Sequence, residues 1–238
     1  VELYKDKLLF KHNGDCFTIK NLTSLIQQVS SKSDQGQDPN VTGKFGTGFI
    51  TTHLLSRIFT IYGVAKSQTD CCKKFKMVVD RDADNSKAMI TKIKDALDEL
   101  RNLKTKDVFD NYEENRTEDD MDTTFEYPLN SETYEYANIG VKDLLNVLPY
   151  SLLFIPLIKK VTVFIYKNDE YQKILVKRQE EIKGEGIEEV TISKEESTFK
   201  NDKETKKSEN STYIMNSKGR LNIVWPIKKE NGIYKIQK

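Results

Sequence analysis

The sequence predicts an α+β protein in which helices and strands form a first domain and a run of short strands follows. Three observations lead to this prediction. Apolar residues recur at helical spacing in residues 21–29, 86–104 and 131–148. Short apolar or alternating segments lie between those helices and predict strands. Beyond residue 166, short strands separated by Gly, Asn and charged turns follow one another without a helical segment.

The predicted first domain is residues 1–166, which hold all three amphipathic helices. Residues 167–238 are predicted to form an antiparallel β extension or the start of a second domain. The apolar block at residues 152–158 follows Pro149, so we expect a strand there. The run at residues 194–211 is almost entirely polar, and we expect a disordered segment or a long hairpin tip.

Composition and cysteine usage exclude several classes of function. The net charge of +1 gives no reason to expect nucleic acid or a membrane surface as partner, and no apolar run could span a bilayer. Cys16, Cys71 and Cys72 are an odd set, and adjacent cysteines seldom bridge each other, so we expect unpaired thiols in the cytoplasm. Together with His12 and His53 they lack zinc-ligand spacing, so no protein metal site is predicted.

A glycine-rich turn precedes the apolar segment at residues 50–61, and residues 48–56 are predicted to form a helix directly behind the turn. Its residues are Gly43, Lys44, Phe45, Gly46, Thr47 and Gly48. Glycines let the backbone approach a ligand closely, and a helix that begins behind them offers unpaired N–H groups and a dipole to a phosphate. The glycine order fits neither the P-loop nor the dinucleotide fingerprint. The alternative is a tight packing turn.

Two further motifs lie on either side of this turn in the sequence. The apolar strand at residues 8–10 leads into His12, Asn13, Gly14, Asp15, Cys16, Phe17 and Thr18, and a later strand reads Asp122, Thr123, Thr124, Phe125, Glu126, Tyr127, Pro128 and Leu129. In this order, the three motifs resemble the ATP-binding domain of the Hsp90-like (GHKL-type) ATPases. The resemblance is greatest to the divergent sacsin-like and NO VEIN-like branch, and it covers roughly residues 1–165.

This resemblance implies a fold and a phosphate site. The fold is the two-layer α/β sandwich of the Hsp90 ATPase type (Bergerat fold), here with a β-rich C-terminal extension. The phosphate-binding residues would be Gly43, Lys44, Phe45, Gly46, Thr47 and Gly48. Lys44 either pairs with a phosphate or faces solvent, and Phe45 has a core position as its alternative. The polar residues 30–42 are interpreted as a nucleotide lid, with an ordinary surface loop as the alternative.

The same resemblance assigns His12, Asn13, Gly14 and Thr123 to the adenine side. His12 stands where the family has an Asp that accepts a proton from the exocyclic amine of adenine. An imidazole nitrogen or the Asn13 carbonyl can accept that proton instead, although neither is a charged acceptor, so the sequence leaves base selectivity open. Thr123 either hydrogen-bonds near the ring or is a plain strand residue.

The catalytic residues are not identified. In the family, a helix before the first strand carries the general-base Glu and an Asn that holds Mg²⁺, and we expect that helix upstream of Val1. The resemblance therefore implies an ATP- and Mg²⁺-dependent module of a larger chain, in which ATP hydrolysis drives lid closure. A homodimer is the partner arrangement that it suggests. The alternative is a non-hydrolytic nucleotide-binding or scaffolding domain. A histidine kinase is disfavoured, because neither His12 nor His53 lies in a separate dimerisation helix.

Overall fold

The computed structural model describes residues 1–27, 51–66, 72–103, 105–107, 112, 116–117, 119–168, 170–184, 186–201, 203–218, 221–230 and 233–236. These residues belong to two compact units. Unit 1 comprises Val1–Tyr4 and Asn138–Lys238, and unit 2 comprises Lys5–Ala137. The units divide inside a helix, whereas the predicted domains divide at residues 166 and 167. The glycine-rich turn and the predicted lid lie outside the described residues.

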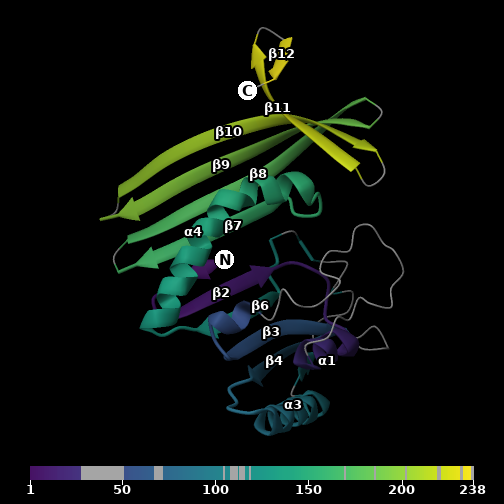
Figure 1. The fold of residues 1–238 in the computed structure, drawn as a ribbon, viewed down its shortest axis with the longest axis vertical. Coiled ribbons are helices and arrows are strands. Elements are labelled where there is room, and N and C mark those ends of the chain that lie inside the picture. The colour runs from purple at the N-terminus through teal and green to yellow at the C-terminus, as the bar shows by residue number, and fades with distance from the viewer. Residues whose placement is uncertain are drawn as a thin grey trace. The chain divides into compact units, whose positions relative to one another are not determined.

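Unit 2 contains an antiparallel sheet and the candidate site. Its elements, in chain order, are β2 (Lys7–His12), α1 (Ile19–Gln27), the 3₁₀ helix η1 (Thr51–Leu54), β3 (Ile58–Lys66), β4 (Cys72–Asp80), α3 (Ser86–Arg101), β5 (Thr105–Asp107) and β6 (Thr123–Pro128). The strand order is β2-β6-β3-β4-β5, with antiparallel pairing throughout. Figure 1 shows β2, β6, β3 and β4 side by side.

One face of this sheet carries the core of unit 2. Phe125 is the cross-strand partner of both Phe10 and Ile61, so these three side chains share a face. Leu22 and Ile26 of α1 are buried, with exposed fractions of 0% and 1%. Because they stand four residues apart, both lie on the same side of the helix. The motif strand predicted at residues 123–129 is present as β6, which fits its alternation of buried and half-buried residues.

The helix predicted at residues 86–104 is present as α3. Asn85 caps it, because its side chain accepts a hydrogen bond from the Ala88 backbone N–H at 2.9 Å. Its apolar face is buried mainly toward the C-terminal end, at Ala96 and Leu100, whereas Ile90 is 54% exposed.

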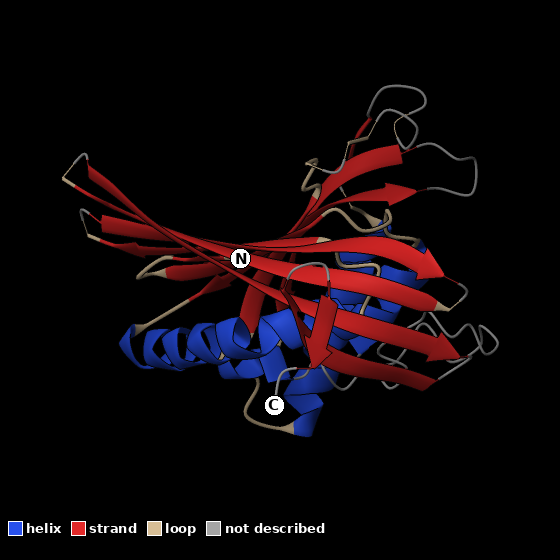
Figure 2. Cartoon of the chain, turned by 90° about the horizontal axis from the view of Figure 1, so that it is seen from above, coloured by secondary structure: helices blue, strands red, loops and turns tan. Residues whose placement is uncertain are grey.

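Unit 1 contains the remaining strands, most of which are longer. Its elements are β1 (Glu2–Leu3), the part of α4 (Ser131–Phe154) from residue 138 on, β7 (Lys160–Lys167), β8 (Glu170–Gly184), β9 (Ile187–Lys200), β10 (Lys203–Lys218), β11 (Leu221–Glu230) and β12 (Ile233–Ile236). The strand order is β12-β11-β10-β9-β8-β7-β1, and only the β1–β7 pair is parallel. Figure 1 shows α4 along one face of these strands, and Figure 2 shows the twist of the long strands.

The polar residues 194–211 form the long hairpin tip rather than a disordered segment. They belong to β9 and β10. These strands pair without a break, from Ile187 opposite Asn216 to Lys200 opposite Lys203. Lys194 is paired with Glu196 at 2.7 Å and lies 3.8 Å from Glu209 on the opposite strand. Opposite charges on one sheet face stabilise strand pairing, so a composition that resembles a loop is compatible with a strand here.

The predicted two-layer α/β sandwich of the Hsp90 ATPase type is wrong. The described part of the chain consists mainly of strands, twelve in number, with three α-helices. The residues after α4 are the main reason, because they form long paired strands with no covering helix of their own in the sequence order. The predicted β extension is therefore not a minor addition but most of unit 1.

The strand predicted at residues 152–158 is also wrong at its start. Helix α4 continues through Pro149 to Phe154. Proline removes one helical hydrogen bond, but Leu152 and Leu153 beyond it are 0% and 2% exposed, and this burial favours continuation of the helix.

Candidate functional site

The candidate site lies in unit 2, where β2 ends and β6 begins. His12 is the last residue of β2 and Thr123 the first of β6, and the two are Cα partners in the antiparallel register. Directly opposed side chains of an antiparallel pair project from the same face. The structure therefore brings together His12 and Thr123, which the sequence had assigned to one side of a base, and Asn13 and Gly14 follow His12 directly.

The imidazole of His12 is engaged with its own turn. The backbone N–H of Gly14 donates to Nδ1 of His12 at 3.0 Å. A Cβ built on Gly14 would stand 2.9 Å from that Nδ1 atom, closer than real Cβ atoms approach, so a side chain at position 14 would displace the ring. This contact explains why a glycine suits the position.

Two aromatic rings lie beside the imidazole of His12. The ring centroids of Phe10 and Phe125 lie 5.8 and 6.2 Å from that of His12. Burial lowers the pKa of His12 below its ordinary value, and the positive charge of Arg116 lowers it further. The ring is therefore neutral at neutral pH.

Arg116 holds the turn from the other side. One terminal nitrogen of its guanidinium donates to the carbonyl oxygens of Asn13 and Gly14, at 3.0 and 2.9 Å. Its Nε lies 2.9 Å from Oδ2 of Asp122, and both side chains are mostly buried, with 15% and 17% exposed. Asp122 directly precedes Thr123, so Arg116 connects the two chain segments that form the site.

Sequence reasoning missed Arg116. It lies in the acidic run at residues 110–122, which composition predicts to be a solvated loop. The available signal was a single cationic residue in that run, and an acidic partner six residues later. Neither feature indicates which backbone carbonyls the guanidinium would reach.

A small buried cluster supports this segment. Tyr112, which is 6% exposed, packs with Val64 and Cys72, and Cys16 packs against the same cluster. Burial raises the pKa of Tyr112, and the nearby Asp122 carboxylate raises it further, so the phenol stays neutral.

Thr123 occupies a less open position than the sequence suggested. It is 2% exposed, whereas His12 and Phe10 beside it are half-buried and 44% exposed. Within this turn, the imidazole and not the Thr123 hydroxyl is the polar group more accessible to a ligand.

The predicted phosphate-binding residues Gly43, Lys44, Phe45, Gly46, Thr47 and Gly48 lie outside the described residues. The described elements before and after them in the chain are α1 and η1. The helix predicted at residues 48–56 is present in its described part only as the short 3₁₀ helix η1. Arg81 connects these two elements: it donates to the carbonyl oxygens of Leu25 and Ile26 in α1, the latter at 3.2 Å, and to Nε2 of His53 in η1 at 2.7 Å. Arg81 is 3% exposed, and burial lowers its pKa to about 10.

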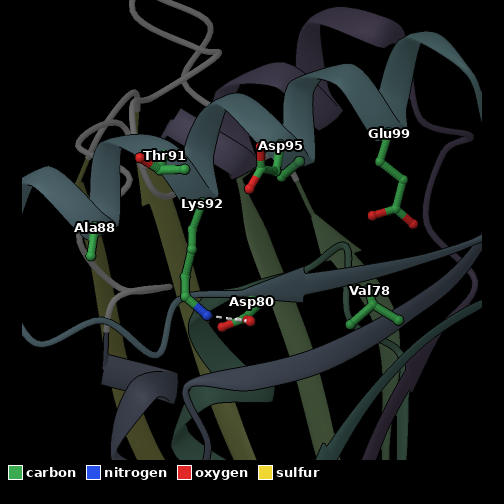
Figure 3. Close-up of a pocket in the computed structure, with 8 residues that line it drawn as sticks. Val78, Asp80, Ala88, Thr91, Lys92, Asp95 and Glu99 are labelled. Atoms are coloured by element: carbon green, nitrogen blue, oxygen red, sulfur yellow. Dashed lines mark hydrogen bonds and ion pairs between the residues drawn. The ribbon is translucent and has the colours of Figure 1, made fainter.

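A groove of about 510 Å³ lies between α3 and β4, and none of the predicted site residues lines it. It is lined by Val78 and Asp80 of β4 and by side chains of α3 (Figure 3). Lys92 of α3 pairs with Asp80 across the groove. Asp95 and Glu99 of α3 also line the groove, so its charged lining is mostly acidic.

The remaining observations concern metals, membranes and related proteins. No group of three His, Cys, Asp or Glu residues that could hold a metal occurs in the described part of the chain. Among the described helices, none is long and apolar enough to cross a membrane. Comparison with models of protein families, with curated proteins and with solved structures found no match.

Proposed function

We propose that this chain is the nucleotide-binding module of a larger protein, and that ATP hydrolysis with Mg²⁺ drives a conformational switch in that protein. ATP is the nucleotide that the sequence motifs favour. The observation that carries the proposal is the turn at His12, Asn13 and Gly14, which Arg116 holds next to the start of β6. A half-buried polar ring beside Phe10 and Phe125 is suited to a heteroaromatic base, which needs both apolar contact and a hydrogen-bond partner.

The phosphate half of the proposal rests on sequence. Gly43, Gly46 and Gly48 would donate backbone N–H groups to the β- and γ-phosphates, with Lys44 and Thr47 as additional partners. The segment that contains them runs between α1 and η1, and Arg81 joins those two elements.

A binding module without hydrolysis is the second candidate. One observation favours it: Asp122, the described carboxylate in contact with Arg116 at the site, is occupied by that ion pair. A cytoplasmic location and a homodimer also belong to the proposal, and the former is supported by Cys16 and Cys72, which form no disulfide.

Thermal unfolding with and without nucleotide tests the proposal. We expect ATP with Mg²⁺ to raise the melting temperature of the protein, and Gly46→Val to abolish the shift because its side chain blocks close backbone approach. Gly140→Ala is the control, since a Cβ there meets nothing within 4 Å. No shift in the unmodified protein at saturating nucleotide would contradict the proposal. Phosphate release by the full-length protein then separates hydrolysis from binding.

A further inference from the structure

The hydrogen bond between Gly14 and His12 determines which imidazole nitrogen carries the proton. A backbone N–H can only donate, so Nδ1 of His12 must accept at this 3.0 Å contact. A neutral imidazole has one acceptor and one donor nitrogen. Nε2 therefore carries the hydrogen, and the part of the ring that is not engaged with the turn presents an N–H donor.

The surroundings of the ring favour this neutral tautomer. Protonation would place a second N–H at Nδ1, directed at the N–H of Gly14, and would lose that hydrogen bond. It would also put a positive charge near the guanidinium of Arg116, whose own charge is paired with Asp122. Phe10 and Phe125 contribute apolar contact on the same side and no compensating negative charge.

A donor at this position has a consequence for the base. The six-position of adenine carries an amino group, whose hydrogens can only be donated, so it would oppose the Nε2–H of His12. The six-position of guanine or hypoxanthine carries a carbonyl oxygen, which accepts a hydrogen bond. An unmatched donor in a partly buried site costs binding free energy, because it loses its water without gaining a partner.

We propose that His12 is a specificity-determining residue and that its Nε2–H donates to the six-position oxygen of a 6-oxopurine nucleotide, which the site prefers to ATP. The proposal rests on the proposed function and on the resemblance, which assigns His12 to the position that contacts the six-position of the purine. It corrects the expectation that the imidazole accepts a proton from adenine. The turn has used the acceptor nitrogen of the ring, so only the donor remains for the ligand.

Inosine triphosphate and ATP are the matched probes, because both are purine ribonucleoside triphosphates without a substituent at the two-position. We expect the protein to bind inosine triphosphate at least about ten-fold more tightly than ATP, by calorimetry with Mg²⁺. GTP should follow inosine triphosphate. Tighter or equal binding of ATP would overturn the inference and leave the proposed function standing, whereas no binding of any of the three would overturn both.

Two variants whose new side chains have nearly the same shape as each other test the role of residue 12. An Asn or Asp side chain can accept from the N–H two residues later, so both His12→Asn and His12→Asp can keep the turn. The amide of His12→Asn still offers an N–H donor, and this variant should retain the preference for inosine triphosphate. The carboxylate of His12→Asp offers only acceptors, and it should shift the preference toward ATP by about ten-fold or more. An unchanged ratio in His12→Asp would contradict the proposal, and this ratio is insensitive to a general loss of stability.

The tautomer itself can be measured without a ligand. The chain has two histidines, so long-range ¹H–¹⁵N spectra of the imidazoles contain few signals, and His53→Gln assigns them. We expect the Nδ1 resonance of His12 to have the shift of an unprotonated nitrogen and Nε2 that of a protonated one. The opposite pattern would overturn the proposal, whatever the nucleotide affinities.

Discussion

The guanidinium of Arg116 donates to the carbonyl oxygen of Gly14 at 2.9 Å, across 102 residues of sequence. The same group donates to the carbonyl of Asn13 and pairs with Asp122. One side chain therefore satisfies two consecutive carbonyls of a turn and connects it to the strand that pairs with β2. Without it, those carbonyls and the carboxylate would depend on solvent.

Replacement of Arg116 should loosen this turn. Arg116→Met keeps much of the side-chain volume but removes two hydrogen bonds and leaves Asp122 without its cation. We expect the free energy of unfolding to fall by about 1–3 kcal/mol. Urea unfolding measures it, with Arg101→Met as control, because Arg101 is 77% exposed and pairs only along its own helix. An equal, small effect in both variants would show that the Arg116 contacts carry no stability.

Replacement of Arg81 should affect α1 and η1 together. Its guanidinium is buried and binds carbonyls of α1 as well as His53. Arg81→Met leaves those carbonyls unsatisfied, and we expect a loss of about 2–4 kcal/mol. Amide hydrogen exchange should accelerate in both elements. Arg57→Met is the matched control, since Arg57 is 60% exposed and lies 3.5 Å from Asp82; if exchange accelerates in only one element, Arg81 does not couple the two.

Acidification should destabilise the protein through its histidines. The pKa values of His12 and His53 are lowered, each by burial first and then by a nearby arginine. A histidine whose pKa is lower in the folded state binds its proton more readily when unfolded. Its stabilisation is therefore present above the unfolded-state value of about 6.5 and is lost as the pH falls below it.

Urea unfolding between pH 7.5 and 5 measures this dependence as free energy of unfolding against pH. In His12→Asn the slope through the acidic range should decrease, because the titrating group is gone while the turn is kept. The slope that remains should decrease again in the double variant with His53→Gln. An unchanged slope in His12→Asn would show that the folded-state pKa of His12 is not lowered.

Substitution of Gly63 should disturb the packing of the motif residue Phe17. A Cβ on Gly63 would lie 2.9 Å from the ring of Phe17 and 3.1 Å from that of Phe75, and these two rings pack edge-on at 5.7 Å. We expect Gly63→Ala to reduce the melting temperature, with a cost of about 1–3 kcal/mol. Gly140→Ala, in an open helical position, should instead stabilise by about 0.5–1 kcal/mol. A neutral Gly63→Ala would mean that both rings have room to move.

Local elements were the part of the structure that sequence patterns could predict. The spacing of apolar residues identified α3 and most of α4, and the alternation of residues 123–129 identified β6. Motif order also grouped His12 to Gly14 with Thr123, which the register of β2 and β6 brings together. Such features depend on periodicity over a few turns or on short strands, which the chain expresses locally.

The sequence by itself determined the positions of α1, α3, β4 and β6 in unit 2, and that a tight His-Asn-Gly turn follows β2. Only the tertiary structure decided that Arg116 reaches that turn and that Nδ1 of His12 accepts a hydrogen bond from Gly14. It also decided that the polar residues of β9 and β10 pair as strands. The physical reason is the range of the interactions. The periodic spacing of buried residues is a property of a single segment. A hydrogen bond between residues 102 positions apart, or the pairing of two polar strands, depends on where the rest of the chain lies.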